Sequence, residues 1–244
     1  MIIDNVRDLG IKEGDILLVA SDVSKLIYSW NDFDANKFID SLINKIGANG
    51  TLLFPTFNWD FCHGKVFDYK NTKSETGYLS NVALNRKDFV RTLHPIYSFA
   101  VCGAGANYLK KDNNIRSFGQ HSPFGYLHRH NGKMIIIDLD YQNSFTFVHY
   151  VERQEEAKYR ENKYFTSMYV NEQGEGEIMT RAMYVRKDGV INNLNAIGKI
   201  LEQKGIAKVS MIHEVKFTLI DLVKAYDIIA EDVKTGGRNL IKYV

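Results

Sequence analysis

The sequence has few of the residues that stiffen or cross-link a chain. Its 244 residues include three prolines and two cysteines, Cys62 and Cys102. Two cysteines cannot make the disulfide framework of a small secreted domain, and they suit the reducing cytoplasm. No Pro/Gly-rich linker, internal repeat or low-complexity tract divides the chain. We therefore predict a single cytoplasmic domain over residues 1–244.

Long hydrophobic runs and an excess of one charge are also missing. No apolar run approaches the about 18 residues of a membrane helix, and the first residues carry acids instead of a signal-peptide pattern. Lys and Arg number 31 against 29 Asp and Glu, for a net charge of +2. The missing apolar run argues against membrane insertion, and the charge balance argues against broad nucleic-acid binding, which needs a concentrated basic face. It leaves room for a local cluster that holds a small phosphorylated ligand.

The chain has enough apolar residues, 45%, to bury a full core. "GDILLVAS" and "GTLLFPTF" are typical of buried strands, and apolar residues between them recur with helical spacing at positions 35–46. A strand, a packed helix and a second strand predict a parallel pair with a right-handed crossover. "SFAVCG" and "GKMIIIDLD" indicate further strands.

The second half combines a hairpin with another α/β segment. Alternating residues around a Gly-rich turn predict an antiparallel hairpin at 165–190. "NLNAIGKILEQKG" predicts a helix and "AKVSMI" a strand, and "TLIDLVKAYDIIAEDV" predicts a helix with a capping box formed by Thr218 and Asp221. The fold class we expect is α/β, with a mixed, mostly parallel central sheet and helices on both faces, plus the hairpin. Residues 58–80 are aromatic and polar without period, which predicts a long functional loop.

His149 and Glu152 lie three positions apart at the start of a predicted helix, so their side chains share one face. An imidazole that titrates near neutrality can take the proton of an amine, and a neighbouring carboxylate can orient it. A lone histidine is more often structural than catalytic, so the role of His149 has to be judged from the rest of the sequence. The charged stretch "RQEEAKYR" that follows is typical of a solvated helix face.

Several blocks, in order, resemble the aminoglycoside 3-N-acetyltransferase family, from about residue 9 to 155. The most specific are "HPIYSFAVCG", "HSPFGYL" and "FTFVHYVE". The resemblance implies an acyl-CoA-dependent N-acyltransferase that uses acetyl-CoA or another acyl-CoA and no metal. It also implies that His149 is the general base, with Glu152 beside it. The loop after the first strand, the His-Pro-x-x-Ser segment and the two other blocks give the expected coenzyme ligands Ser21, Ser24, His94, Ser98, Ser122 and Thr146.

The sequence departs from the family pattern at two places. Where family members carry "VHSSL" this chain has "VASDV", so Ala20 and Asp22 replace a histidine and a serine. Where the family tends to have glycine at a strand end, this chain has "IIDLD". With one more acid from the long loop, the candidates for contact with an acceptor amine are Asp22, Asp60, Asp138 and Asp140.

Three functions remain open from the sequence. A polycationic aminoglycoside calls for an acidic cleft, and the sequence pI is about 8.3. We therefore expect the acceptor to be an amino sugar. A nucleotide-linked amino sugar, of the kind used to make surface polysaccharides, is one form of this expectation. Acetylation of an aminoglycoside antibiotic is the alternative within the enzyme class. The altered "VASDV" loop motivates a third reading, a catalytically weak protein that binds CoA or a sugar. The oligomeric state is not indicated.

Other chemistry-bearing residues do not form a recognisable motif. The spacing of His121, His128 and His130 matches no zinc pattern. Cys62 is followed directly by His63, and adjacent side chains on an extended chain point apart. "GAGAN" lacks the third glycine of a dinucleotide-binding loop.

Overall fold

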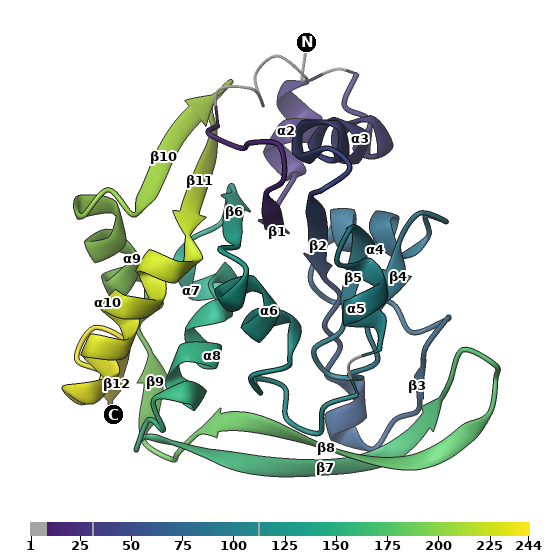
Figure 1. Ribbon diagram of the computed structural model, residues 1–244. Helices are drawn as coiled ribbons and strands as arrows, with labels where there is room; N and C mark the ends of the chain where they lie inside the picture. Colours follow the sequence, from purple (N-terminus) through teal and green to yellow (C-terminus); the bar gives the residue numbers. More distant parts are fainter. Residues whose placement is uncertain (1–8, 31, 112) are drawn as a thin grey trace.

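The computed structural model describes residues 9–30, 32–111 and 113–244. In this part of the chain a seven-stranded mixed sheet forms the centre (Figure 1). Its strands, in order across the sheet, are β10 (Ala207–Ile212), β11 (Val215–Asp221), β6 (Lys133–Ile137), β1 (Ile16–Ser21), β2 (Thr51–Pro55), β5 (Phe99–Gly103) and β4 (Val90–Arg91).

Parallel pairing is confined to the middle of this sheet. β1 pairs in parallel with β2 on one side and β6 on the other, whereas the outer neighbours pair antiparallel. The predicted strand–helix–strand unit is confirmed, with α3 (Ala35–Ile46) between β1 and β2. The α/β class with a mixed sheet is confirmed. The carboxyl ends of β1, β2 and β6 meet at one edge of the sheet, where α/β proteins collect binding sites.

Helices cover both faces of the sheet because successive strand residues point to opposite sides. Leu17 and Val19 pack on one side, in a cluster with α2 (Ser24–Ser29), α3 and α4 (Tyr78–Leu84). Leu18 and Ala20 pack on the other. That second cluster contains residues of α5 (Ala106–Lys110), α6 (Pro123–Arg129), α7 (Tyr141–Ser144), α8 (Phe147–Gln154), α9 (Leu194–Gln203) and α10 (Leu222–Lys234).

The predicted hairpin is confirmed and is longer at its start. β7 (Arg160–Val170) pairs antiparallel with β8 (Gly176–Arg186), and β3 (Phe67–Asp68) joins β7 in a second sheet. The long ribbon runs along one side of the molecule, below α6 and α8 in the view of Figure 1. A small pair, β9 (Val190–Asn192) with β12 (Ile241–Tyr243), follows it.

The helix predicted from "TLIDLVKAYDIIAEDV" is wrong in its first part. Thr218 lies inside β11, opposite Val209 of β10 and Ile136 of β6, because this apolar run completes the sheet. The helix α10 begins only at Leu222, and the carboxylate of Asp221 caps it by accepting from the backbone N–H of Lys224 at 3.1 Å. The capping box is therefore replaced by a single N-cap.

The expected loop at 58–80 contains short elements. A 3-10 turn, η1 (Asp60–His63), and β3 lie within it, and α4 begins at Tyr78. In the described part of the chain, we find no helix with both the length and the apolar character needed to cross a membrane.

Candidate active site

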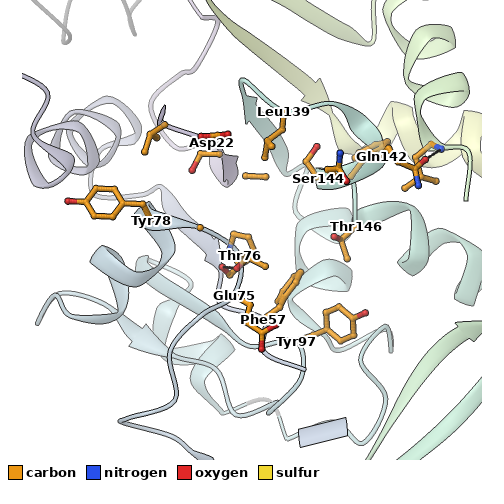
Figure 2. A pocket seen from close by; sticks show the side chains of 18 of the residues that line it. Asp22, Phe57, Glu75, Thr76, Tyr78, Tyr97, Leu139, Gln142, Ser144 and Thr146 are labelled. Atoms are coloured by element: carbon orange, nitrogen blue, oxygen red, sulfur yellow. Dashed lines mark hydrogen bonds between the residues drawn. The ribbon is translucent and has the colours of Figure 1, made fainter. Parts of the chain in front are cut away.

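A cavity of about 560 Å³ lies at the carboxyl ends of the three parallel strands (Figure 2). Its walls come from the loop after β1, the segment after β2, the turn before α4, and the chain that leads from β6 through α7 into α8. The lining includes Ser21, Asp22, Ser24, Phe57, Trp59, Glu75, Thr76, Tyr78, Tyr97, Gln142, Asn143, Ser144, Thr146 and His149.

His149 lies in the first turn of α8 and is one of the residues that line the cavity. Its Nδ1 is 2.7 Å from Oε2 of Glu152, and the side chain is 14% exposed. Phe118 packs edge-on against the ring, with 5.8 Å between centroids. Within the described residues Nε2 has no hydrogen-bond partner. Since Nδ1 is engaged with the carboxylate, Nε2 is the nitrogen left for chemistry.

Glu152 has no exposed surface and is held between two cationic or potentially cationic groups. The Nε of Arg160 lies 2.5 Å from the same Oε2 and forms an ion pair with it. The guanidinium also donates to the carbonyl of Tyr184 at 3.2 Å and to Oδ1 of Asn192 at 2.7 Å. Burial alone would raise the pKa of Glu152, but His149 and Arg160 outweigh it and hold that pKa below its ordinary value.

His149 is kept neutral by its surroundings. Burial lowers its pKa from the ordinary 6.5, and the positive charge of Arg160 acts in the same direction. Glu152 opposes both without reversing the shift. The imidazole is therefore free to accept a proton near neutral pH, which is the requirement for a general base.

Asp22 and Glu75 give the cavity an acidic character. Asp22 accepts from the backbone N–H of Ser24 at 2.9 Å, and hydrogen bonds from Ser24 lower the pKa of its carboxyl. Glu75 accepts from the backbone N–H of Trp59 at 3.1 Å. Figure 2 shows both around the same space as Thr146. Among the described residues that line this cavity there is no lysine or arginine, so it favours a cationic ligand.

Three of the expected coenzyme ligands line the cavity and three do not. Ser21, Ser24 and Thr146 are in the lining. His94 is buried, and its Nδ1 accepts from the backbone N–H groups of Ile96 and Tyr97. Burial lowers its pKa to about 3. His94 thus holds a turn together and lies outside the cavity.

Ser98 and Ser122 also have structural partners. Ser98 is fully buried, donates to the carbonyl of Thr56 at 2.8 Å and accepts from Nε of Arg91 at 3.1 Å. Ser122 is the N-cap of α6, accepts from the backbone N–H of Gly125 and donates to the carbonyl of Gly119 at 2.6 Å. Both hydroxyls therefore form hydrogen bonds within the fold.

Of the four acids expected at the acceptor, only Asp22 lines the cavity. Asp60 pairs with Lys65 at 2.8 Å. Asp138, in a left-handed backbone conformation with φ 50°, pairs with Lys25 at 2.9 Å. Asp140 caps α7 by accepting from the backbone N–H of Asn143 at 3.0 Å. The structure gives these three acids partners of their own and places them outside the lining.

The residues that sequence reasoning missed have identifiable signals. Glu75, Thr76 and Tyr78 belong to the long aperiodic loop, which was expected to be functional without a choice of residues. Arg160 was counted in a solvated face, but it is buried and begins β7. Only the switch from a helix to an alternating strand pattern could have marked it.

Cys62 is no nucleophile in this environment. Burial raises the pKa of its thiol to about 11, so it stays protonated at neutral pH. The ring of His63 hydrogen-bonds the carbonyl of Trp59 instead. Among the described residues no group of three or more His, Cys, Asp or Glu side chains could hold a metal ion.

The sequence model of the aminoglycoside 3-N-acetyltransferase family matches residues 18–234. The chain belongs to this family. It is accordingly an N-acyltransferase whose co-substrate is an acyl-CoA.

Solved structures of low sequence identity share the fold. Aminoglycoside acetyltransferase AAC(3)-Xa is 19% identical with a TM-score of 0.82, over 96% of this chain and 92% of that one. AAC-IIIb in a binary complex with CoASH is 16% identical with a TM-score of 0.79, over 96% and 95%. The YokD protein from Bacillus subtilis is 20% identical with a TM-score of 0.78, over 94% and 96%.

Proposed function

We propose that this enzyme transfers an acetyl group from acetyl-CoA to an amine of an aminoglycoside or a similar amino sugar. The observation that carries the proposal is the buried His149–Glu152–Arg160 cluster, whose histidine lines an acidic cavity and has Nδ1 engaged with Glu152. The family and the fold it shares with aminoglycoside acetyltransferases support the same reaction.

His149 takes the proton that the attacking amine must lose. An amine can attack a thioester carbonyl only as the free base, and Nε2 is the acceptor for the proton that leaves nitrogen as the amide bond forms. Glu152 fixes the Nδ1–H tautomer and stabilises the imidazolium that results. The thiolate of CoA leaves with the electron pair of the broken C–S bond and is protonated to the free thiol.

Hydroxyl groups around His149 are available to the carbonyl oxygen and to the sugar. Thr146 stands at the start of α8 without capping it by its side chain, and it lines the cavity together with Ser21 and Ser24. A hydroxyl that donates to the thioester oxygen would stabilise the negative charge that develops there. Sugar hydroxyls can use the remaining groups.

The acidic residues of the cavity are the reason for proposing a cationic acceptor. The balanced charge of the whole chain argues for a less cationic amino sugar, and a nucleotide-linked one is therefore the second candidate. Local charge decides what a cavity binds, however, because surface charges farther away than about 10 Å are screened at physiological salt. Asp22 and Glu75 lie in the lining, so they favour a substrate with several ammonium groups.

The test is thiol release from acetyl-CoA with a panel of aminoglycosides, simple amino sugars and nucleotide-linked amino sugars, confirmed by the mass of the acetylated product. His149→Ala should lower kcat/KM by ~100-fold or more with the best acceptor, as expected for loss of a general base. His130→Ala is the control, since His130 is exposed at the end of α6 and outside the cavity.

The acceptor that supports thiol release distinguishes the candidate functions. Turnover with aminoglycosides supports the proposal, and turnover confined to nucleotide-linked sugars replaces it with the second candidate. CoA binding without thiol release from any acceptor would identify a binding protein and contradict the proposal.

A further inference from the structure

Arg91 is a buried arginine outside the cavity, and it takes no part in the proposed proton transfer. It is the last residue of β4 and is 5% exposed. In the described part of the chain no carboxylate forms an ion pair with its guanidinium. Burial lowers its pKa to about 10, which still leaves it charged at neutral pH. A buried cation without an acid partner is costly unless other groups satisfy its donors.

The donors of Arg91 are satisfied by oxygens from both sides of the guanidinium. On one side it donates to the carbonyl of Thr56 at 3.4 Å, and its Nε donates to the hydroxyl of Ser98 at 3.1 Å. That hydroxyl in turn donates to the carbonyl of Thr56 at 2.8 Å. On the other side the guanidinium donates to the carbonyls of Tyr69 at 3.1 Å and Thr72 at 2.6 Å. Arg91 therefore joins the segment directly after β2 to the second half of the long loop.

Two aromatic residues of the loop strengthen this connection. The guanidinium carbon of Arg91 lies 4.6 Å from the ring centre of Phe67, which is within the range of a cation–π contact. The hydroxyl of Tyr69 donates to the backbone carbonyl of Arg91 at 2.7 Å. The loop is thus held by the side chain and by the backbone of the same residue.

The segments that Arg91 joins form one wall of the cavity. Phe57 and Trp59 lie just after its first contact, Glu75 lies three residues after its last, and all three line the cavity. The backbone N–H of Glu75 donates to the carbonyl of Phe57 at 2.8 Å, and its carboxylate accepts from the N–H of Trp59 at 3.1 Å. Figure 2 shows Glu75 beside Phe57. The position of the Glu75 carboxylate therefore depends on how closely the two segments are held together.

We propose that Arg91 is a positioning residue of this enzyme, which holds the two segments together and so places Glu75 for contact with the ammonium groups of the acceptor. This inference rests on the proposed function, which assigns the acceptor to the cavity. The guanidinium contacts the loop and Ser98 and does not touch the His149 cluster. Arg91 therefore acts on acceptor binding and leaves proton transfer unchanged.

The experiment measures KM and kcat for the best acceptor in wild type, Arg91→Lys and Ser98→Ala, each with and without Glu75→Gln. Lysine keeps the charge, but its three donors lie on one nitrogen and match fewer of these oxygens. Arg91→Lys should raise KM by ~10-fold and change kcat by less than ~3-fold, because an interaction that serves binding is lost. In the Glu75→Gln background the same substitution should change KM by less than ~2-fold, since the carboxylate that it positions is absent.

Ser98→Ala provides a milder test of the same connection. It removes one acceptor of Arg91 and one donor to Thr56, with little change in volume. It should raise KM in the same direction as Arg91→Lys and by less, and Glu75→Gln should again remove the effect. Circular dichroism of each variant checks folding, and Ser98→Ala keeps the test valid if Arg91→Lys does not fold.

Arg86→Lys is the matched control. Arg86 is a partly buried arginine near β4 that pairs with Asp40 at 2.6 Å and with Asp88 at 2.7 Å, and it lies outside the cavity. Its substitution disturbs a similar set of hydrogen bonds without touching the loop, so KM and kcat should stay as in wild type.

Three results would overturn the inference. They are an unchanged KM in both Arg91→Lys and Ser98→Ala, an increase in KM that is equally large in the Glu75→Gln background, and a fall in kcat at unchanged KM. The second result would mean that Arg91 supports the fold in general and does not act through Glu75. Wild type without turnover on any acceptor would contradict the proposed function and this inference with it, whereas turnover in wild type with any of the three results contradicts this inference alone.

Discussion

Glu152 is a carboxylate with no exposed surface, and its charge is balanced inside the protein. A buried carboxylate is costly unless it is paired, and here His149 and Arg160 contact the same oxygen. Burial and the positive charge of Arg160 lower the pKa of His149 against the opposing effect of Glu152, so the histidine is not forced into its protonated form. The arrangement orients the imidazole and keeps it a base at the same time.

Replacement of Glu152 by Gln should therefore damage both stability and activity. It leaves Arg160 buried without its counter-charge, and we expect the free energy of unfolding to fall by about 3 kcal/mol. It also removes the acceptor that fixes Nδ1–H, so kcat should fall by ~10-fold or more. Urea denaturation and steady-state kinetics measure the two effects.

Glu161→Gln is the matched control, since Glu161 is exposed on the same strand as Arg160. It should change neither quantity. A Glu152→Gln variant as stable and as active as wild type would show that the carboxylate is not needed, and the proposed role of the cluster would be lost.

At the scale of elements, α8 carries the part of the site that the sequence predicts best. The three-residue spacing of His149 and Glu152 depends only on helix geometry, and their contact at 2.7 Å follows from it. Arg160 could not be predicted in this way, because it reaches Glu152 from the first residue of β7 after the chain has turned. Contacts set by local periodicity are readable from sequence, and those set by tertiary packing are not.

The same difference bears on the other residues expected at the site. The serines of "HPIYSFAVCG" and "HSPFGYL" were expected near the coenzyme, yet Ser98 bonds Arg91 and Thr56, and Ser122 caps α6. A motif indicates that a residue type is needed, and it does not distinguish a ligand from a structural bond. Glu75 lies in an aperiodic loop, where the sequence offers no spacing from which to choose it.

The single N-cap of α10 gives a test at this scale. Asp221→Ala removes the acceptor for the backbone N–H of Lys224, and the free energy of unfolding should fall by about 1 kcal/mol. α10 packs against α8, so the loss is expected in global stability measured by urea denaturation. Asp227→Ala, an exposed aspartate inside the same helix, should have little effect. Equal losses in the two variants would contradict the assignment of Asp221 as the cap.

At the scale of the whole molecule, the net charge of +2 conceals an uneven distribution. The cavity beside His149 contains two acids and no basic residue among its described lining, whereas the surface between the α5–α6 loop and the end of α8 carries Arg116 and Arg153. The sequence pI argued against a polycationic acceptor because it averages over these regions. The position of each charge is a property of the fold.

Removal of the cavity's acids tests this distribution. The double variant Asp22→Asn/Glu75→Gln should raise KM for a polycationic aminoglycoside by ~10-fold or more, since ion pairs in a partly enclosed site are lost. KM for an amino sugar with a single amine should rise less. Added salt should weaken aminoglycoside binding to wild type more than to the variant.

Asp88→Asn, at an exposed acid outside the cavity, is the control and should leave both KM values unchanged. If the double variant affects the two acceptors equally, or neither, the cavity does not select its substrate by charge.

The ratio of kcat/KM for wild type to that for His149→Ala, measured as a function of pH, tests the central claim most directly. Ionisation of the acceptor amine is common to both proteins and cancels in the ratio. Burial holds the pKa of His149 below 6.5, so the ratio should be ~100 or more and level from neutral pH down to about 6.5. Below that pH it should fall towards one as the imidazole becomes protonated. A ratio near one at neutral pH, or a large ratio that stays constant far into acid, would contradict the role of His149 as the base.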